Sequence, residues 1–417
     1  MYNDELNNEF NTDNLMLLPS ATRLEYKSKR GEKTSIAWGQ RKLLMSEIEF
    51  FTIYWNNEKI PNPHCVYAGA APGDHILLLS KMFPSFTFDL YDPRGFSIDP
   101  VEGKINIFQE YFTDTEVEKY KDKDNIFFIS DIRTVDYASI YKNVGNKYGF
   151  NIKFDENHQL IIEKLGSNEI FKEIPREIKK DIEKITEEEV FGDMMRQQDW
   201  IFKMNPEHAL IKFRLPYYYD NTDVNKSYLK GVVYWQPWAP QTSTETRLKP
   251  IKNKQTNKYE EGLWNIQEYE EWCSFHNIEV RCKFLFNNIF TGNEEPFTDE
   301  MVNDYDSMCE AMILKLYFDK FCHNTENKYD MVKILSKEIT SFLNTDQKTQ
   351  VKRNISLTDI RESGCGKYSI YVKSLGNPKT IKILKPENET VLDNDGYNST
   401  FDFTNQISNE PTRFKLC

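Results

Sequence analysis

The chain has 417 residues, a net charge of −12, 39% hydrophobic residues and 14% aromatic residues. This length allows one large domain with additions, or two to three domains, and the apolar content is sufficient for a sizeable core. No uninterrupted apolar run approaches the length of a membrane-spanning helix, and the N-terminus lacks the basic and then apolar pattern of a signal peptide. We therefore expect a soluble intracellular protein with no membrane association.

Cysteine usage and charge exclude further classes. The seven cysteines form no CxxC pair, so a disulfide framework or zinc site is not expected, and we predict no metal site. The negative charge counts against a general nucleic-acid binder. Two basic clusters are candidates for a local RNA-binding rim, with solvated loops as the alternative. They are Lys27, Lys29, Arg30 and Lys33, and Arg247, Lys249, Lys252 and Lys254.

Periodicity predicts an α/β protein. From Gly39 to Trp55 the apolar residues recur at three- and four-residue steps, which is typical of an amphipathic helix. Short apolar runs predict strands at Cys65–Ala68, Phe86–Tyr91, Ile105–Phe108, Ile126–Ser130, residues 209–215 and Gly231–Trp235. Strands that alternate with helical stretches indicate a parallel sheet covered by helices, and a ligand then lies at the carboxyl ends of the strands.

The remaining segments divide the chain. Residues 1–19 are polar, and 20–255 hold the expected sheet. Within the sheet region, residues of about 150–200 are charge-rich and indicate an insertion that contains helices. Residues 256–386 form a mixed α+β C-terminal extension, and 387–417 form a polar tail whose composition is typical of disorder. In the extension we expect helices at Asp299–Phe321 and Tyr329–Phe342, and strands at Tyr368–Val372 and Thr380–Leu384.

The turn AGAAPGDH after the first strand indicates a cofactor site. Its glycines let the backbone approach a ligand, and Asp92 ends the next strand where a carboxylate can accept from ribose hydroxyls. Arg94 then either supports the ligand or pairs with Asp92. The alternative for the turn is an ordinary βα connection. GxGxxG and GxxxxGK[ST] are both absent, which argues against a nicotinamide enzyme and a nucleoside triphosphatase.

Four polar residues stand at or near expected element ends: Lys42, Asp131, Lys212 and Glu245. Two lysines and two acids suit methyl transfer to a ribose hydroxyl, which needs in-line placement and a group that accepts the proton. A neutral lysine can do this if its pKa falls from about 10.4 toward about 8, which is about 3 kcal/mol. Individually, Lys42 is also explained as a solvent-exposed residue, Asp131 as a strand-end cap, Glu245 as half of an exposed pair with Arg247, and Lys212 as an edge-strand residue.

Taken in order, six motifs resemble those of the poxvirus-type mRNA cap 2′-O-methyltransferases, within the FtsJ-like ribose methyltransferases that carry a Lys-Asp-Lys-Glu tetrad. The motifs are GQRKLL, VYAGAAPGDH, YDPRG, FISDIR, LIKFRLPY and QPWAPQTSTETRL, and they span roughly residues 20–250. The resemblance implies a Rossmann-like methyltransferase sheet, Lys42, Asp131, Lys212 and Glu245 as the catalytic tetrad, and Lys212 as the base.

The resemblance also implies the ligands. S-adenosyl-L-methionine would contact Gln40, Tyr67, Gly69, Gly73, Asp92, Arg94, Asp131 and Arg133. The cationic 7-methylguanine of the m7G-capped mRNA would stack between Tyr26 and Tyr217, with Asp220 as the candidate that reads the guanine edge.

The resemblance also bears on partners and location. The partners would be a poly(A) polymerase catalytic subunit or other capping enzymes, and the location would be the host cytoplasm, in the factory of a large DNA virus, or the virion. The insertion at 150–200 and the extension after residue 256 depart from the compact members of the family. The alternatives are a bifunctional or non-catalytic processivity subunit of a viral poly(A) polymerase, and an FtsJ-like enzyme that acts on uncapped RNA.

Overall fold

The computed structural model describes residues 25, 38–154, 160–167, 169–171, 173–217, 224–240, 243–277, 305–322, 328–343, 380–384 and 389–393. The polar segment 1–19, most of the tail 387–417 and the expected strand Tyr368–Val372 lie outside these residues. Among the residues described, no helix is both long and apolar enough to span a bilayer.

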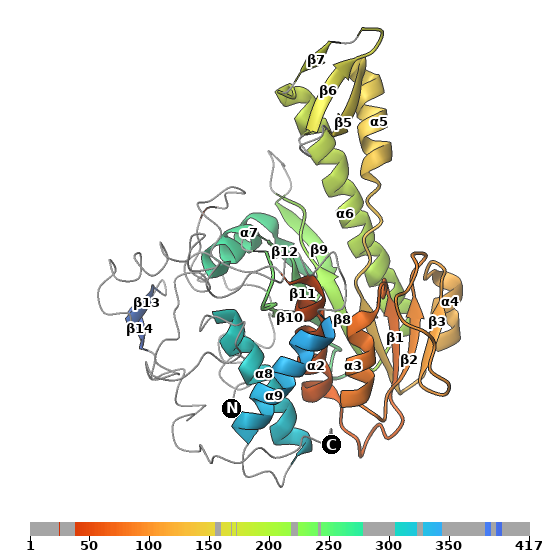
Figure 1. The fold of residues 1–417 in the computed structure, drawn as a ribbon, viewed down its shortest axis with the longest axis vertical. Helices are drawn as coiled ribbons and strands as arrows, with labels where there is room; N and C mark the ends of the chain where they lie inside the picture. Colours follow the sequence, from red (N-terminus) through yellow and green to blue (C-terminus); the bar gives the residue numbers. More distant parts are fainter. Residues whose placement is uncertain are drawn as a thin grey trace.

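A seven-stranded sheet forms the centre of the molecule (Figure 1). Its order is β10-β11-β8-β4-β1-β2-β3, and the five strands from β8 to β3 are mutually parallel. β11 runs antiparallel to both β8 and β10. The strands are β1 (His64–Ala68), β2 (Thr87–Tyr91), β3 (Ile105–Phe108), β4 (Ile126–Ser130), β8 (His208–Phe213), β10 (Gly231–Tyr234) and β11 (Thr246–Pro250). This mostly parallel sheet confirms the predicted Rossmann-like α/β fold.

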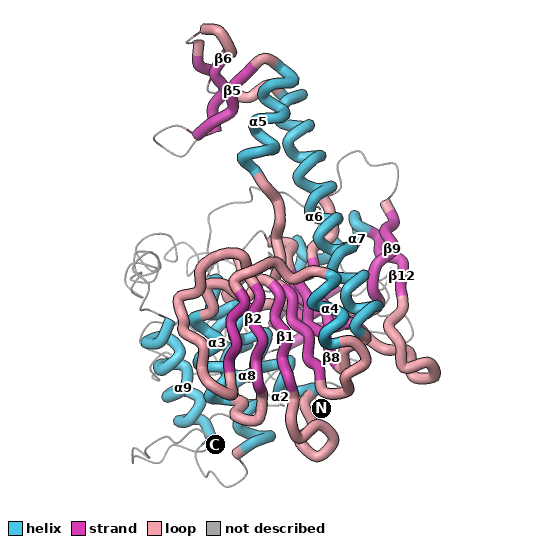
Figure 2. Tube along the Cα trace, turned by 90° about the vertical axis from the view of Figure 1, so that its right-hand side faces the viewer, coloured by secondary structure: helices cyan, strands magenta, loops and turns pink. Residues whose placement is uncertain are grey.

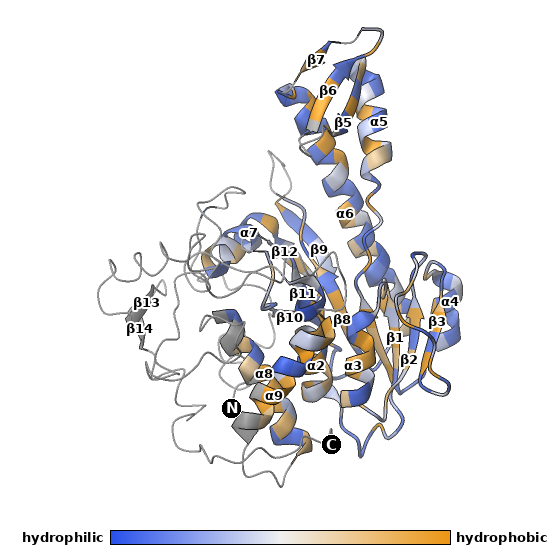
Figure 3. Ribbon diagram, in the orientation of Figure 1, coloured by the Kyte–Doolittle hydropathy of each residue, from blue (hydrophilic) through white to orange (hydrophobic). Residues whose placement is uncertain are grey.

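Helices cover both faces of the sheet because the strand side chains are apolar on both faces. On β1, Cys65 and Tyr67 pack with the helices of one face, and Val66 and Ala68 pack with those of the other. Figure 2 shows the two helical layers, and Figure 3 shows the hydrophobic strands between them. The first layer contains α2 (Gly39–Tyr54), α3 (Asp74–Met82), α8 (Tyr305–Phe321) and α9 (Lys328–Leu343); the second contains α4 (Asp114–Tyr120), the C-terminal half of α6 (Arg176–Met204) and α7 (Ile266–Phe275).

The insertion projects from the body as an arm (Figures 1 and 2). It consists of α5 (Tyr137–Tyr148), a three-stranded antiparallel sheet of β5 (Phe150–Phe154), β6 (Leu160–Lys164) and β7 (Ile170–Phe171), and the N-terminal half of α6. A small apolar cluster of its own, which includes Ile140, Ile162 and Ile182, holds the arm together. The expectation of helices is confirmed by α6, whereas the sheet was not anticipated.

The C-terminal extension packs against α2 through its helices. Leu314, Tyr317 and Leu335 belong to the same hydrophobic cluster as Leu44 and Phe51. At the centre, Arg41 donates two hydrogen bonds to Glu310, both 2.6 Å long, and both side chains are 0% exposed. Within 256–386, α8 and α9 thus buttress the helix that carries Lys42.

Two two-stranded antiparallel sheets are also described: β9 (Asn225–Leu229) pairs with β12 (Glu261–Asn265), and β13 (Thr380–Leu384) pairs with β14 (Glu389–Asp393). The predicted strands at 105–108, 126–130 and 380–384 are confirmed with their bounds. The helices expected at 299–321 and 329–342 are confirmed as α8 and α9, with residues 299–304 outside the described part of the chain.

Candidate active site

The candidate site lies where the sheet reverses its strand order. β1 pairs with both β2 and β4, so the chain turns in opposite directions on either side of β1, and ligands of open α/β sheets bind at such a point. Gly69 follows β1 with φ +82°, and a Cβ there would come within 2.8 Å of the Asp131 carbonyl carbon. The amide of Asp131 in turn donates to the Ala68 carbonyl at 2.9 Å. A glycine is required at position 69 because two backbones meet there.

The four predicted tetrad residues lie together at this point. The Lys42 Nζ is 2.7 Å from the Glu245 Oε1, and the Lys212 Nζ is 2.9 Å from the Asp131 Oδ1 and 3.7 Å from the Glu245 Oε2. The side chains of Lys42, Lys212 and Glu245 are 13–14% exposed, so they are largely buried but still accessible to a ligand. Residues from α2, β4, β8 and the start of β11 thus converge on one ion-pair network.

Arg247 is the member of this network that the sequence analysis did not identify. Its buried guanidinium donates to the Asp131 Oδ1 at 2.7 Å and to the Ser130 carbonyl at 3.2 Å. The pairing of Glu245 with Arg247 that was considered from sequence is not what the structure shows, since Glu245 pairs with Lys42, Lys212 and Arg133. A charged residue on a strand was the only signal, and its buried position depends on β11 pairing with β8.

Lys212 is also not an edge-strand residue. β8 lies between β4 and β11, so neither side of the strand is open to solvent. An internal strand that carries a lysine must place a partner at its ammonium group, because an unpaired buried charge is costly. Asp131 and Glu245 provide those partners, so the edge-strand interpretation of Lys212 was wrong.

Electrostatics fix the charge states of the network. Burial acts to raise the pKa of Asp131, but attraction to Arg247 and Lys212 outweighs it and holds the pKa well below its usual range. Burial likewise opposes ionisation of Glu245, and attraction to Lys42 and Lys212 nevertheless lowers its pKa to about 2. Burial lowers the pKa of Lys42, an effect that Glu245 partly offsets and Arg247 reinforces.

The acidic residue that ends β2 is placed as predicted for a ribose-binding carboxylate. Asp92 is buried and accepts from the Ala71 amide at 3.1 Å, while Arg94 donates to it at 2.7 and 2.9 Å. Because the Arg94 side chain is 67% exposed, it can yield the carboxylate to a ligand at small cost. Gly73, with φ +85°, leads into α3 beside this turn.

Gln40 and Tyr67 are tied to each other through His75. The Gln40 Oε1 is 2.7 Å from the His75 Nδ1, the other ring nitrogen is 3.2 Å from the Glu47 Oε1, and the Tyr67 hydroxyl donates to that same oxygen at 2.8 Å. Tyr67 is 1% exposed, so its ring faces the interior. Contact of these two residues with a cofactor stays a prediction, and Glu47 and His75 are the positioning partners that sequence did not indicate.

These residues fit S-adenosyl-L-methionine by their chemistry. Asp92 offers an acceptor for ribose hydroxyls, and the chain at Gly69–Gly73 offers backbone groups that a ligand can approach. Among the described residues no group of three or more His, Cys, Asp or Glu is arranged to hold a metal ion.

For the cap, the structure describes one of the three predicted residues. Tyr217 follows β8, and the Arg214 guanidinium lies 4.6 Å from the centre of its ring. Tyr26, Asp220 and the basic cluster at 27–33 lie outside the described residues.

The second basic cluster is not an RNA-binding rim. Arg247 is buried against Asp131, the Lys249 Nζ lies over the Tyr54 ring at 4.5 Å, and Lys252 pairs with Glu207 at 3.2 Å. Three of the four side chains of the cluster thus contact other parts of the protein, which counts against a shared exposed rim at 247–254. Of the four, only Lys254 is exposed.

Fold and site together define a Rossmann-like α/β protein whose strand-reversal point carries a Lys-Asp-Lys-Glu ion-pair network. Residues 14–151 match the family described as "Poly A polymerase regulatory subunit". Over this third of the chain, which contains Lys42 and Asp131, the protein is similar to poly(A) polymerase regulatory subunits. No curated protein matches the chain.

Proposed function

We propose that the protein transfers a methyl group from S-adenosyl-L-methionine to the ribose 2′-hydroxyl of the cap-proximal nucleotide of m7G-capped mRNA. The observation that carries the proposal is the convergence of Lys42, Asp131, Lys212 and Glu245 at the strand-reversal point. The family match of residues 14–151 supports a role in mRNA processing.

The charge balance of the network supports a lysine as the proton acceptor. Lys42, Lys212, Arg133 and Arg247 face only two carboxylates, those of Asp131 and Glu245. This excess of positive charge disfavours full protonation, and arginine does not lose its proton in proteins. A lysine is therefore the kind of cation in this network that can act as the proton acceptor.

Lys212 is the better-placed base. Its Nζ lies between both carboxylates, which can orient the amine toward a hydroxyl. Lys42 contacts Glu245 alone in this network and comes from the helix that covers the sheet face. When bound, S-adenosyl-L-methionine would supply the methyl group, and Asp92, Gly69 and Gly73 are the residues that would hold it.

The direct test is Lys212→Ala. We expect initial methyl-transfer rates on capped RNA to fall by about 10²- to 10⁴-fold, the usual contribution of a positioned acid or base. Binding of S-adenosyl-L-methionine, measured by calorimetry, should change little. Lys254→Ala removes an exposed lysine and is the matched control, expected to retain full activity. Full activity of Lys212→Ala would refute the base assignment.

A second candidate function is favoured by the family description. A protein similar to poly(A) polymerase regulatory subunits would associate with a poly(A) polymerase catalytic subunit and lengthen its products. Co-purification with the catalytic subunit and longer tails in its presence would support this role. Lys212→Ala should leave the tail length unchanged if the two roles are separate.

A further inference from the structure

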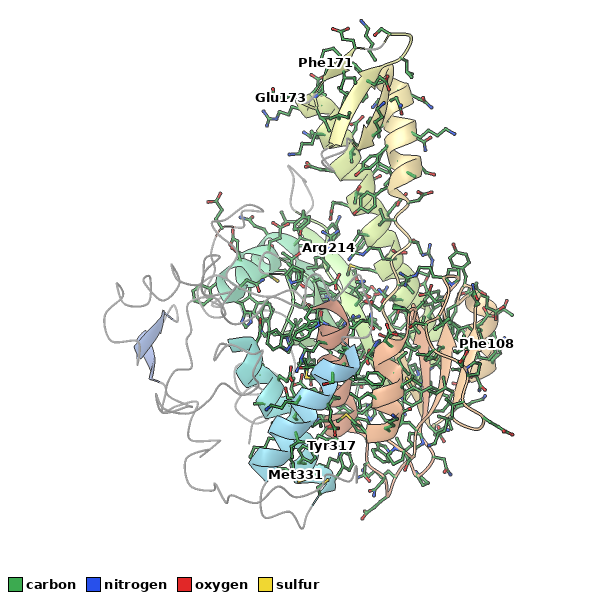
Figure 4. All side chains as sticks on the ribbon, viewed as in Figure 1. Phe108, Phe171, Glu173, Arg214, Tyr317 and Met331 are labelled. Atoms are coloured by element: carbon green, nitrogen blue, oxygen red, sulfur yellow. The ribbon has the colours of Figure 1, made fainter. Side chains whose placement is uncertain are left out.

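The carboxylate of Glu187 lies where the arm joins the body. α6 begins in the arm, where Ile178 and Ile182 pack in the arm's own cluster, and ends in the body, where Trp200 and Ile201 pack beneath the sheet. Glu187 lies between these two parts, and its side chain is only 13% exposed. Figure 4 labels Arg214, its partner, near the base of the arm.

Glu187 makes two contacts with the segment that follows Lys212. Its Oε1 accepts from the Arg214 Nη2 at 3.0 Å, and its Oε2 accepts from the Tyr217 amide at 2.9 Å. β8 ends at Phe213, and Tyr217 lies four residues beyond that end. One carboxylate of the inserted helix thus fixes both the backbone of Tyr217 and the cation beside its ring.

The positive charge of Arg214 affects which ligands can stack on the Tyr217 ring. A guanidinium 4.6 Å from the ring centre repels a second cation that stacks on the same ring. The guanidinium is permanently charged, and burial of the pair leaves little solvent to screen it. Glu187 neutralises this charge at short range.

We propose that Glu187 is a positioning residue that gives the site its preference for a positively charged guanine, the 7-methylated form, over the neutral one. This inference rests on the proposed function, in which Tyr217 stacks on the cap. Glu187 holds the ring in place through the Tyr217 amide and cancels the Arg214 charge that would otherwise oppose the cationic base. The residue that sets this preference, Glu187, therefore belongs to the helix that forms part of the inserted arm.

The Glu187→Gln variant separates the effect of the Glu187 charge from the effect of its hydrogen bonds. The amide oxygen of glutamine can still accept from one of the two donors, but its charge is gone and Arg214 is left uncompensated. We expect the KM for RNA with an m7G cap to rise about tenfold, because repulsion between two cations at this range is of that order. The KM for RNA with an unmethylated guanine cap should change less than about twofold, and kcat should be retained on both. Glu188→Gln, in an exposed position on the same helix, is the matched control and should resemble the wild type.

Binding of 7-methyl-GDP and of GDP, followed by fluorescence, provides an independent readout. The ratio of the two dissociation constants should fall about tenfold in Glu187→Gln and stay unchanged in Glu188→Gln. An equal loss on both caps, or no change in either assay, would overturn the inference. If the wild type binds 7-methyl-GDP without methylating capped RNA, the proposed function fails while the role of Glu187 is still decided by the binding ratio.

Discussion

At the scale of single residues, the site is defined by which carboxylate each cation contacts. Asp131 accepts from Lys212 and Arg247, and Glu245 accepts from Lys42 and Arg133. Sequence reasoning identified the tetrad because four separate motifs each placed one polar residue near an element end. It did not identify Arg247, since the burial of that residue is produced by non-local pairing of β11 with β8.

The depressed pKa of Glu245 predicts a pH dependence of stability. Its pKa is about 2 in the folded protein against 4.5 for an unperturbed carboxyl, so ionised Glu245 stabilises the fold above pH about 4.5. This contribution is lost as the pH falls toward 2. The difference in unfolding free energy between the wild type and Glu245→Gln, measured in urea, should therefore shrink between pH 5 and about 2. A difference that is constant, or that grows toward low pH, would contradict the ion-pair assignment.

At the scale of elements, α8 and α9 pack against α2 and so support the helix that carries Lys42. Glu310 on α8 accepts from Arg41, which precedes Lys42, and also from Trp238 at 2.8 Å and Ser336 at 2.7 Å. A fully buried carboxylate with this many donors is the kind of group whose removal leaves an uncompensated charge. The extension thus supports α2, the helix that carries Lys42.

Removal of Glu310 should be among the most damaging single changes. We expect Glu310→Ala to lower the free energy of unfolding by about 3–5 kcal/mol, because Arg41 stays buried without its partner. Asp319→Ala on the same helix removes a partly exposed pair with Lys315 and should cost less than about 1 kcal/mol. Denaturant titration of both variants compares them, and equal midpoints would show that the buried pair does not buttress α2.

The elements also show what sequence could and could not predict. β3 and β4 were predicted with their bounds, because each is a short apolar run between turn residues. The strands of the arm, the β9–β12 pair and β11 were missed. They are polar on one face or charged, and β9, β11 and β12 pair with strands that are distant in sequence.

At the scale of the whole molecule, the arm and the sheet form one functional unit. α6 enters the body from the arm, and through Glu187 and Asp193 it holds the segments after both β8 and β4. Asp193 accepts from the Thr134 amide at 2.7 Å, three residues beyond Asp131. The insertion, which sequence marked only as a departure from compact relatives, is therefore connected to the segments after β4 and β8, the strands next to Asp131 and Lys212.

The net charge of the protein affects which kind of RNA substrate is expected. With a net charge of −12 and one of the two basic clusters turned inward, the protein has little basis for tight, non-specific RNA binding. Recognition would then depend on the cap. This expectation separates a cap methyltransferase from an enzyme that acts on uncapped RNA.

The central claim is tested most directly by methyl transfer on three matched RNAs, with an m7G cap, an unmethylated cap or a 5′-triphosphate. Labelled S-adenosyl-L-methionine is the donor, and nuclease digestion locates the label. The proposed function predicts label on the ribose of a cap-proximal nucleotide, at least about tenfold faster on the m7G-capped RNA. Equal labelling of capped and uncapped RNA, label on a base, or no label on any of the three would contradict it.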